Sequence, residues 1–181
     1  VPLNEIAGGF TVTIKPTGAP RTITGSSASG LIGFNGADGV TIDGSLSGGT
    51  DRSLTIAPTN TGTTGGGIYF APGAAGAQNN VVKNIKGNGA GATTGILLGI
   101  TFAGNTFGGV GADNDNNRVE NCSVTGAFYG IASLGASAAN KDTGVVITKD
   151  VLPGVGTAGI GRVGIYVVFA DGAQITENNV A

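Results

Sequence analysis

The sequence has no histidine, no methionine, no tryptophan and a single cysteine, Cys122. One cysteine excludes an intramolecular disulfide and says nothing about the redox compartment. Without histidine, any catalysis would depend on Asp, Glu, Lys, Arg, Tyr or Ser, and no imidazole is present to activate a thiol. We therefore expect Cys122 to be a small buried residue rather than a nucleophile.

Charge is also scarce. Asp, Glu, Lys and Arg make up 11% of the chain, against about 25% in an average protein, and the formal net charge is −2. The sequence has no cluster of basic residues that could bind the phosphate backbone of a nucleic acid, so we expect no nucleic-acid partner. No apolar run approaches the roughly 18 residues of a membrane span, so we expect no membrane insertion. The chain begins with Val1 and shows no signal peptide, which predicts a mature product or a fragment of a larger exported protein.

Glycine is abundant, with 36 of 181 residues, and 40% of the residues are hydrophobic. An interior glycine destabilises a helix by about 1 kcal/mol and a proline by about 3 kcal/mol. The longest segment free of both, residues 112–125, has no sustained 3.6-residue apolar period. We therefore predict an all-β protein with almost no α-helix, forming one domain over residues 1–181.

Short segments rich in β-branched and aromatic residues alternate with Gly, Asn, Asp and Pro, a pattern typical of strands separated by turns. Ten segments are predicted as strands: residues 10–14, 31–34, 40–42, 54–56, 68–70, 96–98, 131–134, 145–147, 165–169 and 174–176.

A repeat of about 34 residues organises these strands. Its first element is a glycine followed by a large apolar residue: Gly30-Leu31, Gly67-Ile68, Gly95-Ile96, Gly130-Ile131 and Gly164-Ile165. Its second element holds apolar pairs at one spacing: Val119/Val124, Ile147/Leu152 and Ile175/Val180. Between the members of each pair, at the same position, are Cys122, Asp150 and Asn178. Such a repeat predicts a coil whose strands stack in parallel about 4.8 Å apart, with like residues in rows.

Residues 22–56, 113–124, 136–148 and 159–167 resemble the right-handed parallel β-helix repeat domains of bacterial secreted and cell-surface proteins, which have a pectate-lyase-like architecture. The resemblance implies a right-handed parallel β-helix, which is a solenoid, and a secreted or cell-surface location. With about 34 residues in each coil, the 181 residues would make about five to six coils.

Three tyrosines, Tyr69, Tyr129 and Tyr166, lie in or beside strands that open the coils. If they faced outward, they would form an aromatic strip suited to stacking on sugars. Successive strand residues face opposite ways, so the inner neighbours would be Ile68, Ile131 and Ile165. The alternative is aromatic packing under loops or in the core.

The segment of residues 113–117 is the densest group of oxygen ligands, with Asp113 and Asp115 as candidate calcium ligands. Alternating Asp and Asn can bind Ca²⁺ from one loop. The alternative is a corner turn, where Asn and Asp adopt left-handed backbone and bond the local chain. No other cofactor is expected.

Two further groups of charged residues are candidate sites: first Asp38, Asp43, Asp51 and Arg52, and second Lys83, Arg118 and Lys149. In the first group, Asp43 and Arg52 could form an ion pair across a loop. The second group occupies comparable repeat positions and could share a face. A polysaccharide lyase needs a basic residue to abstract a proton and a cation to hold the uronate carboxylate. The alternative for both groups is ordinary solvated charge.

These features favour a non-catalytic extracellular or cell-surface structural or adhesion module. Its expected partners are further copies of itself, stacked end to end into a fibre, or surface glycans, because an exposed parallel edge recruits further strands. A carbohydrate-active enzyme, either a polysaccharide lyase or a glycoside hydrolase on a β-helix, is one alternative. A calcium-stabilised structural rod is the other.

Overall fold

The computed structural model describes residues 2–4, 7–28, 30–62, 66–91, 95–99, 113–154 and 159–181. Every regular element among these residues is a β-strand. The described part therefore holds no helix of the length and hydropathy needed to cross a membrane. The prediction of an all-β protein is confirmed for these residues.

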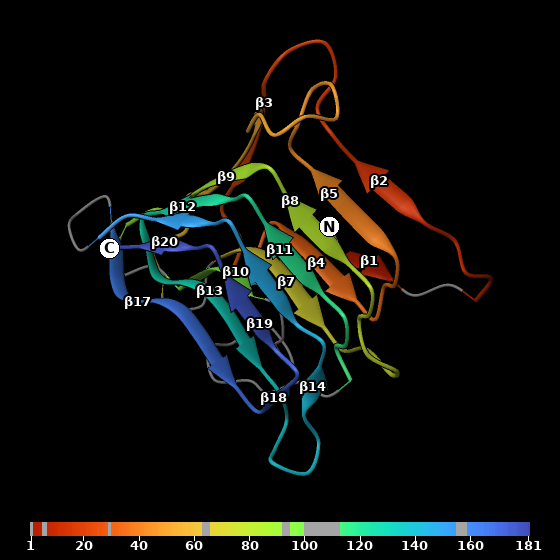
Figure 1. Cartoon of the computed structure of the whole chain (residues 1–181). Helices are drawn as coiled ribbons and strands as arrows, with labels where there is room; N and C mark the ends of the chain where they lie inside the picture. The colour runs from red at the N-terminus through yellow and green to blue at the C-terminus, as the bar shows by residue number, and fades with distance from the viewer. Residues whose placement is uncertain are drawn as a thin grey trace.

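The described strands form three six-stranded sheets and one two-stranded sheet (Figure 1). Sheet A consists of β1 (Pro2–Asn4), β4 (Ile32–Asn35), β7 (Gly66–Ala71), β10 (Ile96–Gly99), β13 (Ala127–Leu134) and β17 (Ile160–Val168). Sheet B consists of β2 (Val12–Ile14), β5 (Val40–Asp43), β8 (Val81–Lys83), β11 (Arg118–Glu120), β15 (Val146–Thr148) and β19 (Gln174–Thr176). Sheet C consists of β3 (Arg21–Gly25), β6 (Leu54–Pro58), β9 (Ile85–Asn88), β12 (Ser123–Thr125), β16 (Val151–Leu152) and β20 (Asn179–Val180). The small sheet pairs β14 (Asp142–Thr143) with β18 (Ala170–Asp171).

Strands are parallel to their neighbours in all of these sheets, and the order within each large sheet follows the chain. The chain passes through sheets A, B and C in turn and then returns to sheet A beside its previous strand. We call one such pass a repeat. The order places β1, β2 and β3 at one end of the stack and β17, β19 and β20 at the other.

The register of sheet B aligns one aliphatic residue from every repeat. This row is Ile14, Ile42, Val82, Val119, Ile147 and Ile175. The row confirms the alignment predicted for the last three members. Residue numbers along the row give repeats of 28 to 40 residues, so the extra residues of long repeats lie in connecting segments and leave the row intact.

The predicted alignment in sheet A needs a correction. Ile68, Leu98, Ile131 and Ile165 are register partners, and the partner in β4 is Ile32 rather than Leu31. Ile96, which the glycine-plus-apolar element had aligned with Ile68, pairs with Gly66 instead. A one-residue slip moves a side chain to the other face of a sheet, and burial of Ile32 at 8% exposure decides the register of β4.

One cluster of buried apolar side chains has members in all three large sheets. Its fully buried members include Phe34, Phe70 and Ile131 of sheet A. Ile42, Val119 and Ile147 are the corresponding members from sheet B, and Ile56, Ile85 and Leu152 those from sheet C. Burial of a side chain of this size stabilises the fold by about 1.5–3 kcal/mol. The three sheets therefore share a single apolar interior.

Sharp corners between sheets B and C are made by residues with left-handed backbone. Asn84, Asn121, Lys149 and Glu177 occupy this corner in four successive repeats, with φ between 52° and 60°. The first three each donate a backbone hydrogen bond to the next repeat. Asparagine tolerates this conformation better than most residues. The corner sequence therefore ends one strand and redirects the chain into the next sheet.

Asparagine side chains continue the hydrogen bonding at the corner that leads into sheet B. Asn80 accepts from the Val40 amide at 2.8 Å, and Asn117 accepts from the Asn80 amide at 2.9 Å. Each also donates through its amide nitrogen to a backbone carbonyl, of Ala37 and Ala77 respectively. Both side chains are fully buried, so the ladder satisfies backbone groups that would otherwise be costly to bury.

Candidate functional site

The first candidate site is a group of aromatic residues on sheet A, the aromatic cluster, made by Tyr69, Phe128, Tyr129 and Tyr166 with Arg162 beside them. The Tyr129 ring centre is 5.0 Å from that of Phe128 and 5.5 Å from that of Tyr166. The Arg162 guanidinium carbon lies 5.7 Å from the ring centres of both Phe128 and Tyr129. The amides of Phe128 and Tyr129 both donate to the Gly95 carbonyl. The register between β13 and β17 is irregular at the same place, with one extra residue in β17 between the pairs Ala127/Ile160 and Tyr129/Val163.

The aromatic cluster lies on the face of sheet A predicted for it. Ile68, Ile131 and Ile165 belong to or pack against the core cluster, as expected, while the tyrosines form a separate group. Tyr69 is 5% and Tyr129 3% exposed, so these two tyrosines are packed in the way that the alternative to an exposed strip describes. Burial raises the pKa of Tyr69 to about 12, so its hydroxyl stays protonated. A sugar could reach only Tyr166, and glycan binding there stays a prediction.

The second candidate site, residues 113–117, forms a corner of the stack. Asp113 has a left-handed backbone and an exposed side chain. Asp115 accepts a hydrogen bond from the Thr143 amide at 2.7 Å. Between them, buried Asn114 accepts from the Ala77 amide at 2.6 Å. These contacts are those of a corner turn, and within the described ranges no three acidic, cysteine or histidine residues gather as a metal site would require.

The third candidate site, the acidic stretch, is dispersed by the fold. Asp43 pairs with Lys83 at 3.4 Å, whereas Arg52 donates to the carbonyl and side-chain oxygens of Asn121, each at 2.7 Å. Asp43 and Arg52 therefore bind other partners instead of each other. Asp51 caps its own loop through the Ser53 hydroxyl at 2.7 Å.

The fourth candidate site is the basic group, Lys83, Arg118 and Lys149, in which Lys83 and Arg118 lie in sheet B and Lys149 lies at its corner with sheet C. Lys83 and Glu120 are register partners. Glu120 is 2.9 Å from Arg118 and 3.9 Å from Lys149. The hydrogen bond from Arg118 lowers the pKa of Glu120, against partial burial, which raises it. Each of the three cations thus has a carboxylate partner, and the group forms an ion-pair network.

A buried column of polar residues lies at the start of sheet C, at the position noted in the repeat. The Cys122 amide donates to Asp150 Oδ1 at 2.7 Å, and the Asp150 amide donates to Asn178 Oδ1 at 2.8 Å. Cys122 and Asp150 are fully buried. Burial raises the pKa of the Cys122 thiol well above its usual range, which makes it a poor nucleophile. Burial also raises the pKa of Asp150, to about 7.

The two ends of the stack form a further surface, whose exposed residues were not predicted as a site from the sequence. Every large apolar side chain that is exposed, within the described residues, belongs to the first or the last repeat. Phe10 and Val12 are 71% and 44% exposed, and Phe169, Ile175 and Val180 are 42%, 49% and 50% exposed. The signal in the sequence was the continuation of the aliphatic rows into the first and last strands. An edge strand with exposed apolar side chains is a template for pairing.

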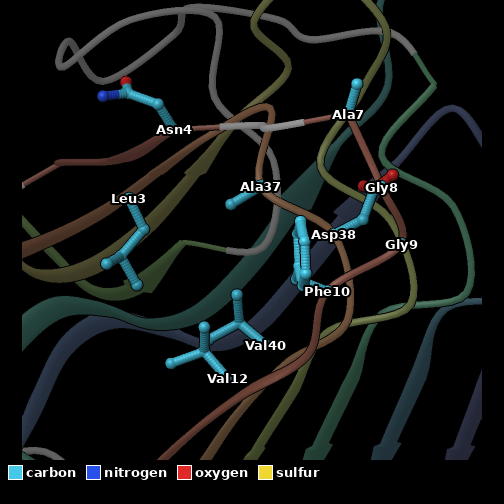
Figure 2. A pocket seen from close by; sticks show the side chains of 10 residues that line it. All are labelled: Leu3, Asn4, Ala7, Gly8, Gly9, Phe10, Val12, Ala37, Asp38 and Val40. Atoms are coloured by element: carbon cyan, nitrogen blue, oxygen red, sulfur yellow. The ribbon is translucent and has the colours of Figure 1, made fainter.

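The first repeat also borders a pocket of about 460 Å³ (Figure 2). Its apolar lining includes Leu3, Phe10, Val12, Ala37 and Val40, which come from the first two repeats. Figure 2 shows Leu3, Val12 and Val40 around this space. The pocket thus lies at the end of the stack that carries β1 and β2.

Comparison with protein-family models, with curated proteins and with solved structures finds no match in any of the three. The assignment of a function therefore depends on the geometry described above.

Proposed function

We propose that the three sheets close into a right-handed parallel β-helix, and that the chain is a non-catalytic structural or adhesion module of an extracellular or cell-surface protein. The cyclic strand order and the single core common to sheets A, B and C support closure. Right-handed crossovers are the rule for parallel strands in one sheet. The resemblance of residues 22–56 and 113–124 to secreted and surface β-helical domains supports the location.

The observation that carries this proposal is the continuation of the apolar rows to both ends. Ile14 and Ile175 are the two ends of a row whose inner members Ile42, Val119 and Ile147 are fully buried. A stack of this kind can be extended by further coils without a change in its internal packing. A building unit for a longer rod needs this property, and an isolated enzyme does not.

The charged residues also favour a structural role over a catalytic one. Lys83, Arg118 and Lys149 are held in ion pairs on sheet B. Asp43 accepts from the Asn84 side chain at 2.8 Å and Asp115 from a backbone amide. A general acid or base needs a polar group directed at a bound substrate. These charged groups instead bind other residues of the same chain.

Single-molecule pulling from the two chain termini tests the proposal. Repeats of 28 to 40 residues extend by about 10–14 nm each at about 3.5 Å per residue. A β-helix pulled along its axis loses its end coils one at a time, so we expect a series of such steps. One release of about 60 nm for the whole chain would contradict it.

A second measurement separates the module from the carbohydrate-active enzyme. The chain is incubated with neutral and uronate-containing polysaccharides, and products are followed by mass spectrometry. We expect no shortened chains and no unsaturated uronates. Turnover that is lost in Arg118→Ala and kept in Lys141→Ala, an exposed loop position, would favour the enzyme instead.

A further inference from the structure

The two ends of the stack match each other row by row. At the first end, the inner positions of sheets A, B and C are occupied by Leu3, Ile14 and Ile23, which pack against the core. At the other end, the same rows finish with Val167, Ile175 and Val180. All six are apolar, so each row could continue from the last repeat of one chain into the first repeat of another.

Charges at the ends are also complementary in this register. Lys15 follows Ile14 and therefore belongs to the row that ends at Thr176. Arg21 pairs with Leu54 and continues an interior row that ends at Asn178, so it does not face the exposed Glu177. Glu177 directly follows Thr176, and the side chains of Lys15 and Glu177 are both exposed. A chain stacked on the last repeat would thus bring Lys15 to Glu177.

The pocket at the first end fits the same arrangement. It is lined by Leu3 and Val12 and lies beside the connection between β1 and β2. The corresponding connection in the last repeat runs from β17 to β19 and is formed by residues 169–173. That segment carries Phe169, which is 42% exposed. Stacking would place an exposed apolar segment against an apolar pocket.

We propose that the partner of each end is a second copy of this chain, stacked head to tail in the same direction. In this contact Ile175 packs on Ile14, Val180 packs on Ile23, and Glu177 lies beside Lys15 of the next copy. The inference depends on the proposed function, because it uses the ends of a β-helix as its surfaces. Such a contact is heterologous and does not close, so it produces a filament.

Sedimentation velocity and electron microscopy over a range of concentrations test this contact. We expect the wild-type chain to form assemblies that lengthen with concentration. Glu177→Lys, and separately Lys15→Glu, should raise the concentration needed for half-assembly about tenfold or more, since like charges then meet. Lys86→Glu, an exposed position in β9 of a central repeat, is the matched control and should assemble as the wild type does.

Mixing the two charge-reversed proteins is the decisive step. Each reversed end then meets an opposite charge, so a one-to-one mixture should assemble as the wild type does. A second variant, Ile175→Asp, blocks one end only and should shorten wild-type assemblies when added in small amounts. Far-UV circular dichroism checks that every variant is folded.

A wild-type chain that stays monomeric at all concentrations would overturn the inference, as would a mixture that fails to assemble. A symmetric dimer unaffected by Glu177→Lys would do so as well. If pulling still shows stepwise release in these cases, the proposed function stands without self-stacking. If the stepwise release is absent too, both fail.

Discussion

Replacing Asp150 by asparagine should stabilise the protein in a strongly pH-dependent way. Asp150 is fully buried, and its Oδ1 accepts from the Cys122 amide. Its Oδ2 has no hydrogen-bond partner among the residues that the structure describes. In the next repeat Asn178 occupies the same position and donates to the Ile147 carbonyl at 2.9 Å. Val119 is the register partner of Ile147, so a protonated Asp150 would have the Val119 carbonyl as the equivalent acceptor.

The magnitude follows from the pKa of Asp150. Burial raises this pKa from 3.8 to about 7, the Glu120 carboxylate acts in the same direction, and the Cys122 amide and the Arg52 guanidinium oppose the rise. Between these two pH values the folded state binds more protons than the unfolded state, so this residue's contribution to stability falls as the pH rises. The free energy of unfolding that is lost because Asp150 resists ionisation is about 4 kcal/mol above pH 7 and less than about 1 kcal/mol at pH 4.

Asparagine has no charge to bury and can donate where the carboxylate cannot. We therefore expect Asp150→Asn to raise the free energy of unfolding by about 2–4 kcal/mol at pH 8, equivalent to about 5–15 °C in Tm, and by less than about 1 kcal/mol at pH 4. Thermal melts of variant and wild type at matched pH measure this. The comparison removes the opposing contributions of Asp43 and Glu120, whose pKa values are lowered.

The matched control is Asp171→Asn, at an exposed site. This variant should have nearly the same free energy of unfolding as the wild type at both pH values. A carbon-13 titration of the Asp150 carboxyl measures the pKa directly. If Asp150→Asn destabilises the protein at pH 8, Asp150 is ionised and held by Arg52, and the reasoning is refuted.

Three other predictions follow from the packing. Asn117→Ala should destabilise the fold by about 2–4 kcal/mol, because it leaves the buried Asn80 amide and Ala77 carbonyl without their partners; a denaturation midpoint close to that of the wild type would contradict this. Ile147→Ala should cost about 2–5 kcal/mol, whereas Ile175→Ala in the same row but 49% exposed should cost less than about 1 kcal/mol in the monomer, as measured by urea unfolding. A chelator should leave Tm unchanged, since the Asp115 carboxylate already holds a backbone amide; a fall in Tm restored by calcium alone would favour the calcium-stabilised rod.

The strands could be predicted from the sequence because their signals are local. All ten predicted strands overlap strands of the structure, although β2 begins at Val12 rather than at residue 10. The second repeat element was harder to predict, because it contains two short strands of different sheets. Asn84, Asn121 and Lys149 separate these strands at one sharp corner. The chain turns between the two strands only because these residues have left-handed backbone, and a lysine in the sequence does not predict that conformation.

The candidate sites were less predictable because they depend on contacts between distant segments. Tyr129 and Tyr166 were expected to lie near each other and do, but no local pattern indicates that Tyr129 is buried. Arg52 reaches Asn121 across 69 positions in the chain, which nothing near Asp43 could reveal. The ladder formed by Asn80 and Asn117 could not be predicted for a related reason, since its hydrogen bonds join different repeats.

The chemical inertness of Cys122 makes the folded chain behave as though it had no thiol. Its side chain is fully buried and its thiolate is disfavoured, so maleimide and iodoacetamide have nothing to attack until the middle of the stack opens. Spectroscopic probes can then be attached to cysteines introduced at either end without removing the natural one. The same residue, left in place, reports opening of the central repeats as a rate of alkylation.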